Sequence, residues 1–209
     1  MARVDQMVRE FAVEVEWVPF ELHPDIPAQG AEKDPSQSRP DVRERLYAQA
    51  QADGLPMTTN PYRSNGHHAL EAAEWAREDS PETFDQVHRA LFQAYFAGAA
   101  NISTIDQVDS AVVQTGVDRA SMRAALEAGT YRQRVDEYTQ LARGNGINGT
   151  PTFILDDKFV ISGAQDWGVF ENILTRLGVP RRAGVEPLPA VESMGTRDVA
   201  PLDRADHAD

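Results

Sequence analysis

The sequence contains no cysteine among its 209 residues. Disulfide bonds and thiolate-coordinated metal sites are therefore excluded, whatever compartment the protein occupies. A cysteine nucleophile is excluded as well, because the thiolate is the reactive species in that chemistry. Any function of this chain has to rest on other side chains or on the backbone.

Basic residues and long apolar runs are also scarce. The chain has 33 acidic and 20 basic residues and a formal net charge of -13, which disfavours binding to nucleic acids and to anionic membrane surfaces. The first residues, MARVDQMVREF, alternate polar with apolar side chains and resemble neither a signal peptide nor a membrane span. We therefore expect a cytoplasmic protein with no nucleic-acid or membrane partner, and the sequence leaves open whether it forms a homodimer.

The apolar residues that are present are enough for one well-filled core. They make up 41% of the chain, and a chain of this length is too short for two ordinary domains with linkers. The sequence predicts one domain over residues 1–178. Residues 179–209 are rich in proline, glycine and charge, and we expect them to form a mostly disordered acidic tail.

Two kinds of periodicity occur near the N-terminus. Apolar residues at positions 4, 7, 8 and 11 share one helical face and predict a helix over residues 2–12. Val13, Val15 and Trp17 then alternate with glutamates, which predicts a strand over residues 13–20. The prolines within residues 21–40 predict an extended loop.

The next hundred residues, 41–143, have a helical pattern throughout, with five or six helices. Ser80 before Pro81 is typical of a helix start. Thr104 with Gln107, and residues 130 with 133, match the reciprocal capping box. Beyond this block, apolar runs at 152–155 and 159–161 predict a β-hairpin, and Asp166 is placed to cap a last helix.

Two stretches of sequence carry a family resemblance. Residues 146–174, GINGTPTFILDDKFVISGAQDWGVFENIL, resemble the C-terminal signature of DsbA-like proteins in residue order and spacing. Residues 13–30, VEVEWVPFELHPDIPAQG, resemble the second strand and loop of the FrnE-like branch of that family. The resemblance implies an α/β, thioredoxin-like fold with a large helical insertion at about 41–143. It also implies a thiol-disulfide oxidoreductase that acts on protein or small-molecule thiols and disulfides.

In thioredoxin folds, the proline of the Gly-Thr-Pro-Thr-Phe motif is cis, lies against the active-site thiol and turns the preceding backbone groups toward the cleft. Pro151 within Gly-Thr-Pro-Thr-Phe occupies that place, so we expect the Thr150-Pro151 bond to be cis and Thr150 to face a cleft that the helical block caps. An extended substrate peptide pairs with backbone groups in such a cleft. The resemblance therefore assigns substrate binding to Gly149, Thr150 and Pro151.

The resemblance does not extend to the catalytic motif of the family. Family members carry Cys-Pro-x-Cys at the start of their first helix, and nothing in this chain matches it. We therefore expect a redox-inactive chain with no catalytic residue. We also expect the open reading frame to extend upstream of Met1 by roughly 15 to 25 codons, enough for one strand of about five residues and the first helical turns. Two alternatives stay open: a relative of the 2-hydroxychromene-2-carboxylate isomerases and kappa glutathione transferases, or a non-catalytic peptide-binding protein.

Histidines are the remaining candidates for chemistry. His67 and His68 point about 100 degrees apart on a helix, so we expect only one of them to share a face with Glu71, as at an ordinary helix start. His88 lies on an apolar stripe and is expected to be a core or cleft residue. The sequence predicts no metal site and no cofactor.

Overall fold

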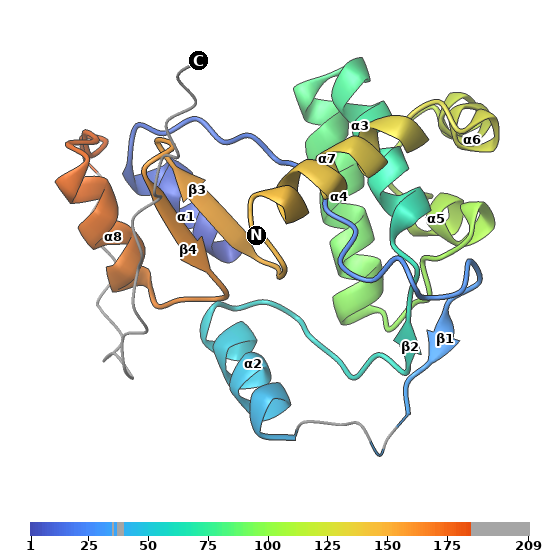
Figure 1. Ribbon diagram of the computed structural model, residues 1–209, viewed down its shortest axis with the longest axis horizontal. Helices are drawn as coiled ribbons and strands as arrows, with labels where there is room; N and C mark the ends of the chain where they lie inside the picture. The colour runs from blue at the N-terminus through green and yellow to red at the C-terminus, as the bar shows by residue number, and fades with distance from the viewer. Residues whose placement is uncertain (35, 37–39, 185–209) are drawn as a thin grey trace. The chain divides into compact units, whose positions relative to one another are not determined.

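The computed structural model describes residues 1–34, 36 and 40–184 (Figure 1). It divides into two compact units. The terminal unit contains residues Met1–Trp17 and the chain from Ile147 onward, and the helical unit is Val18–Gly146. The predicted tail falls largely on residues 185–209, which lie outside the described residues.

The terminal unit consists of a helix, a hairpin and a second helix. They are α1 (Ala2–Glu10), β3 (Thr152–Leu155), β4 (Phe159–Ser162) and α8 (Trp167–Arg176). β3 and β4 pair antiparallel, with Thr152 opposite Ser162 and Leu155 opposite Phe159. This confirms the predicted helix, hairpin and final helix. Asp166 directly precedes α8, but its side chain makes no capping hydrogen bond, so the predicted cap is wrong.

The hairpin turn follows from its two aspartates. Asp156 and Asp157 both have positive φ, at 53° and 52°, and the N-H of Lys158 donates to the C=O of Leu155 at 3.1 Å. Two successive left-handed residues form the turn whose twist matches antiparallel strands, and aspartate tolerates that conformation better than most residues. The turn fixes the register of the hairpin.

The core of the terminal unit joins α1, the hairpin and α8. Phe11 from the end of α1, Ile161 from β4 and Phe170 from α8 are all at most 1% exposed and belong to one apolar cluster. Four further buried residues complete it, namely Val4, Met7, Ile173 and Leu174. The cluster therefore depends on contacts between segments that are about 150 residues apart in sequence.

The strand predicted at residues 13–20 is wrong. In the described part of the chain, residues 12–20 belong to no strand, although Val13 and Trp17 pack against the core of the terminal unit. An alternating pattern sets which side chains face inward, but a strand also requires a neighbouring chain with which to exchange hydrogen bonds. Just before this segment, Phe11 forms a β-bridge with Arg181.

Residues 179–182 were predicted as part of a disordered tail, and this is also wrong. The N-H of Ala12 donates to the C=O of Pro180, and the N-H of Arg182 donates to the C=O of Glu10, both at 2.9 Å. Val179 packs against the apolar cluster. The composition of this segment is polar, but its backbone pairs antiparallel with the end of α1.

The helical unit confirms the predicted helical block. In the described residues its helices are α2 (Pro40–Ala52), α3 (His67–Asp79), α4 (Pro81–Phe92), the π-helical turn η2 (Gln93–Ala97), α5 (Ile105–Ala111), α6 (Arg119–Ala128) and α7 (Arg132–Gly144). α3 packs against α4, α5, α6 and α7. Ala72 and Ala76 on α3 are fully buried, and such small side chains let neighbouring helices approach closely.

A small sheet interrupts the predicted loop and the helical block. β1 (Ala31–Glu32) pairs antiparallel with β2 (Tyr62–Arg63), so the loop at 21–40 and the block at 41–143 each contain a two-residue strand that the sequence did not predict. Two residues are too few to show a period of two. Gly30, with a φ of 79°, precedes β1, and a side chain there would approach Ser103 Oγ within 2.6 Å.

The helix starts show which capping predictions hold. Ser80 caps α4 through the N-H of Thr83, and Thr104 and Gln107 form the predicted capping box of α5. The second predicted box, at Thr130, is wrong. The N-H of Thr130 instead donates to the C=O of Ala125, because the left-handed Gly129 ends α6 at that point. Thr130 is therefore part of the end of α6 and does not begin α7.

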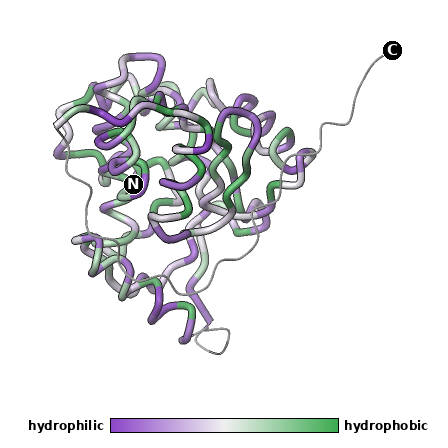
Figure 2. Tube along the Cα trace, turned by 90° about the vertical axis from the view of Figure 1, so that its left-hand side faces the viewer, coloured by the Kyte–Doolittle hydropathy of each residue, from purple (hydrophilic) through white to green (hydrophobic). Residues whose placement is uncertain are grey.

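Figure 2 shows polar and apolar residues alternating along the helices, without one continuous apolar helix. Among the helices of the described residues, none is both long and apolar enough to cross a membrane.

Candidate functional site

The predicted binding residues lie in the loop that leads into β3. The Thr150-Pro151 peptide bond is cis, as the sequence predicts. Thr150 and Pro151 are exposed, and Gly149 is half-buried. The structure thus brings the three residues together on an accessible loop at the start of the hairpin.

Two hydrogen bonds hold this loop on either side of Thr150. The Thr152 hydroxyl donates to the C=O of Gly149 at 2.8 Å, and the N-H of Gly163 donates to the C=O of Pro151, also at 2.8 Å. Within the described part of the chain, neither the N-H nor the C=O of Thr150 has a hydrogen-bond partner. The loop is therefore anchored by its neighbours and presents one free backbone donor and one free acceptor.

Comparison with known proteins identifies the fold that carries this loop. The family model described as a DSBA-like thioredoxin domain matches residues 1–175. The chain belongs to this family. The match includes both motif stretches of the sequence and the whole helical unit, so the predicted fold, a thioredoxin-like fold of the DsbA type with a helical insertion, is confirmed.

Two known proteins resemble the chain along most of its length. The uncharacterized protein YwbO of Bacillus subtilis (strain 168) is 31% identical over 180 residues, which cover 83% of this chain and 87% of that protein. The structure of SCO1869 from Streptomyces coelicolor, described as a probable DsbA oxidoreductase, superposes with a TM-score of 0.74. Its sequence identity is 23%, and the match covers 95% of this chain and 91% of that chain. At this identity the likeness shows the fold.

The missing thiols set this chain apart from the chemistry associated with its family. Thiol-disulfide exchange proceeds by attack of a thiolate through a mixed disulfide, and no residue of this chain supplies a thiolate. The chain therefore has the fold of this family but no thiol nucleophile of its own.

The histidine pair departs from the sequence prediction. Both histidines contact Glu71, because His68 Nδ1 lies 3.2 Å from Glu71 Oε1 and His67 Nε2 lies 3.6 Å from the same oxygen. His67 is the first residue of α3, and the spacings i,i+4 and i,i+3 bring both rings to the same carboxylate. Glu71 is fully buried, and Arg132 Nε lies 4.0 Å from it.

Two residues near His67 were not singled out by the sequence. Glu21 and Asp136 converge on His67 from 46 and 69 positions away, and no short motif links them.

His88, which the sequence places on an apolar stripe, is half-buried between two rings. Its ring centroid lies 5.0 Å from that of Phe84 and 4.8 Å from that of Phe92, and burial lowers the pKa of His88 to about 4.

Proposed function

We propose that the chain binds an extended peptide segment of a protein at Gly149, Thr150 and Pro151, and that it does so without catalysing thiol-disulfide exchange. The observation that carries the proposal is the backbone of Thr150, whose N-H and C=O have no partner in the described residues and lie on an exposed loop. An extended peptide satisfies such groups by pairing with them as an added strand.

The neighbouring strand supports this mode of binding. β3 begins immediately after the loop, so a peptide that pairs with Thr150 is aligned with the direction of the hairpin. Ile154 on β3 is 51% exposed and offers an apolar contact for a peptide side chain. Backbone pairing gives affinity with little sequence preference, which suits a protein that binds unfolded segments.

We also assign the chain to the FrnE-like branch of the family. The motif at residues 13–30 and the long helical segment from α2 to α7 support this assignment. The alternative relationship to the isomerases and kappa glutathione transferases has no comparable support from the residues that surround Thr150.

The test separates binding from exchange by using a peptide without free thiols. Fluorescence anisotropy with labelled, reduced and carboxymethylated insulin B chain measures binding alone. We expect Thr150→Trp to weaken binding about thirtyfold, because it obstructs two hydrogen bonds of roughly 1 kcal/mol each. Thr175→Trp is the matched control, since Thr175 is exposed on α8 of the same unit. Equal affinities of both variants and the wild type would overturn the proposal, and so would the absence of binding by the wild type.

A further inference from the structure

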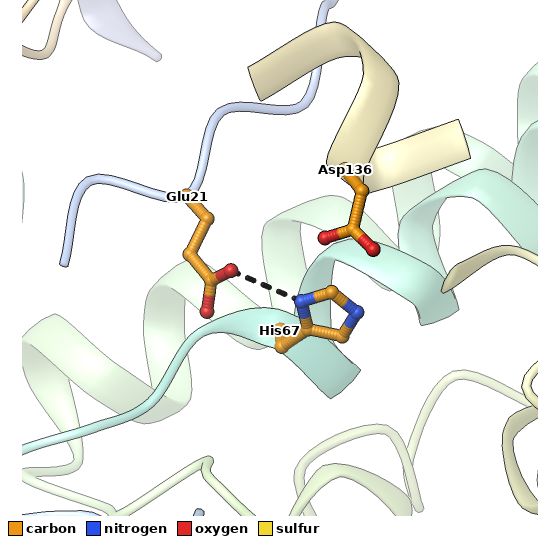
Figure 3. A group of neighbouring side chains, drawn as sticks. All are labelled: Glu21, His67 and Asp136. Atoms are coloured by element: carbon orange, nitrogen blue, oxygen red, sulfur yellow. Dashed lines mark hydrogen bonds and ion pairs between the residues drawn. The ribbon is translucent and has the colours of Figure 1, made fainter. Parts of the chain in front are cut away.

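Three side chains of the helical unit point toward one another from distant segments (Figure 3). Glu21 comes from the loop that follows the first residues of this unit, His67 from the start of α3 and Asp136 from α7. One ligand atom from each lies within 4.8 Å of the others. Two carboxylates and one imidazole form a donor set that suits a divalent transition-metal ion.

Glu21 is held in place by α7 through its backbone. Its N-H donates to Thr139 Oγ1 at 3.0 Å, and its C=O accepts from the Arg143 guanidinium at 3.1 Å. Thr139 and Arg143 lie three and seven positions after Asp136, so all three share one face of α7. The same helix face that supplies one carboxylate therefore positions the other. Preorganisation of this kind is what a metal site requires of its surroundings.

The loop that carries Glu21 is fixed at further points. Asn65 Nδ2 donates to the C=O of Ile26 at 2.8 Å, and Asn101 Nδ2 donates to the C=O of Gln29 at 2.9 Å. Asn65 also accepts from the N-H of His67 at 3.0 Å, which fixes the first residue of α3. Glu21 and His67 are thus held relative to each other by hydrogen bonds that do not involve their own side chains.

His67 uses its two ring nitrogens differently. Nδ1 lies 3.1 Å from Glu21 Oε2, and Nε2 lies 3.6 Å from Glu71 Oε1. Nε2 is buried and has no hydrogen-bond partner in the described structure, and the same is true of Glu71 Oε2. A histidine that binds a metal commonly directs its other ring N-H to a carboxylate, which fixes the tautomer and the ring orientation. The fully buried Glu71 occupies that second position.

We propose that Glu21, His67 and Asp136 bind one divalent transition-metal ion such as Zn²⁺, with His67 coordinating through Nδ1 and Glu71 orienting its ring. Without the ion, Nδ1 of His67 lies at hydrogen-bonding distance from Glu21 Oε2. With the ion bound, Nδ1 and the Glu21 carboxylate both coordinate it. Asp136 is exposed, so its side chain is free to complete the site, and the remaining coordination positions are open to water.

The charge around the site favours a cation but is partly balanced. Glu71 adds a third carboxylate, and the whole chain carries a formal charge of -13. On the positive side, Arg132 contacts Glu71, and Arg143 contacts the carbonyl of Glu21. Within the described residues, neither arginine contacts the carboxylate of Glu21 or Asp136. The two ligand carboxylates are therefore left to the ion.

A bound ion would join three segments that are far apart in sequence. Binding to the folded state alone raises stability by RT ln(1 + [L]/Kd), so the ion should raise the melting temperature of the chain. This effect gives a readout that does not depend on any activity, and it is independent of the peptide binding proposed at Thr150.

The experiment measures Zn²⁺ binding to the tag-free full chain by isothermal titration calorimetry, with Mn²⁺ as the weaker probe expected from the Irving-Williams order. We expect one Zn²⁺ per chain and a higher melting temperature with Zn²⁺. Asp136→Asn should weaken binding at least about tenfold, since even second-sphere changes at metal sites cost that much. Because Asp136 is exposed, this variant should fold, and His67→Ala should abolish binding.

Two control variants distinguish the site from unspecific binding. Glu137→Gln removes the same charge from the next position of α7, and His23→Ala removes an exposed histidine from the loop that carries Glu21. Both should bind Zn²⁺ like the wild type. Unchanged affinity in Asp136→Asn, a loss in Glu137→Gln as large as in Asp136→Asn, or no binding by the wild type would overturn the proposal and leave the cluster as a hydrogen-bonded pair.

Discussion

The two units of this chain assemble their cores from segments at different separations in sequence. The helical unit buries small, aliphatic and aromatic residues, such as Ala72, Leu126 and Trp75, between helices that follow one another in sequence. The terminal unit buries residues that come from opposite ends of the chain, among them Phe11 and Phe170. The helical core is therefore made by local elements, and the terminal core depends on long-range contacts.

The two units also differ in where their charged side chains form contacts. In the helical unit, ion pairs between neighbouring helices accompany the core, as with Arg119 and Asp109 at 2.5 Å. The Arg119 guanidinium lowers the pKa of Asp109, so this pair stays charged at neutral pH. In the terminal unit, two arginines near the end of the described chain, Arg181 and Arg182, bind the end of α1. The terminal unit is thus closed by a short segment that the sequence pattern did not reveal.

The strongest expected effect is in the core of the terminal unit. Phe170 is fully buried, and its ring lies edge-on to Phe153 with a centroid distance of 4.8 Å. Phe170→Ala should lower the free energy of unfolding by about 3–5 kcal/mol through the lost contacts and the cavity. Hydrogen exchange should show the loss of protection in α1, the hairpin and α8.

The matched control for this variant is Leu126→Ala, because Leu126 is fully buried in the helical unit. Its loss of protection should fall on the helices around α3. Equal losses in both units from either variant would show that the units unfold together, and the contrast between their cores would then have no thermodynamic meaning.

A second prediction concerns the pH dependence of the helical unit. The folded state keeps His88 neutral down to about pH 4, because burial lowers the pKa of His88 to about 4, whereas the unfolded chain takes up a proton below about pH 6.5. The unfolded state binds more protons between pH 6.5 and 4. The free energy of unfolding should therefore decrease by about 2–3 kcal/mol as the pH is lowered from 6.5 to 4.

His88→Phe should remove this part of the pH dependence and keep the ring contacts with Phe84 and Phe92. Urea unfolding at pH 7, 5.5 and 4.5 measures the change. His23→Phe, at an exposed position, should keep the slope of the wild type. A slope that His88→Phe leaves unaltered would mean that His88 is protonated in the folded state.

A smaller effect is expected where the chain closes the terminal unit. Arg181 lies 3.2 Å from Glu10, whose side chain is only 1% exposed, and its guanidinium also lies over the ring of Phe11. Arg181→Ala should cost about 1–2 kcal/mol, because the half-exposed arginine is lost while Gln6 still binds the carboxylate of Glu10. Thermal unfolding measures this change. Arg176→Ala, at an exposed position of α8, should have little effect, and a similar loss in both variants would count against a specific role of Arg181.

The sequence predicted elements that are determined by nearby residues. The capping box of Thr104 and Gln107 needs a spacing of three residues, and the hairpin turn at Asp156 and Asp157 needs two residues with suitable backbone preferences. Thr130 has the same spacing to Gln133 but forms no capping box, because its N-H donates to the C=O of Ala125 at the end of α6. Local motifs are reliable when no neighbouring element competes for the same backbone groups.

The errors at residues 13–20 and 179–182 have a common physical cause, which is distance along the chain. Val13 and Trp17 alternate like a strand, yet pairing depends on another segment, and the pairing occurs instead between Phe11 and Arg181. The candidate sites include one that a local motif predicts and one that it does not. Thr150 and Pro151 were predicted from one continuous motif, whereas the approach of Glu21 and Asp136 to His67 follows from the packing of α3, α7 and a loop.

The central claim is that the chain keeps the DsbA-type fold and lacks its thiol chemistry. The most direct test is an insulin-reduction assay of the purified chain with glutathione as the thiol source. Because exchange requires a thiolate and a mixed disulfide, and the chain has no cysteine, the rate should equal that of glutathione in buffer alone. Turnover above that rate, in protein shown by mass spectrometry to be free of contaminating thiol proteins, would contradict the account.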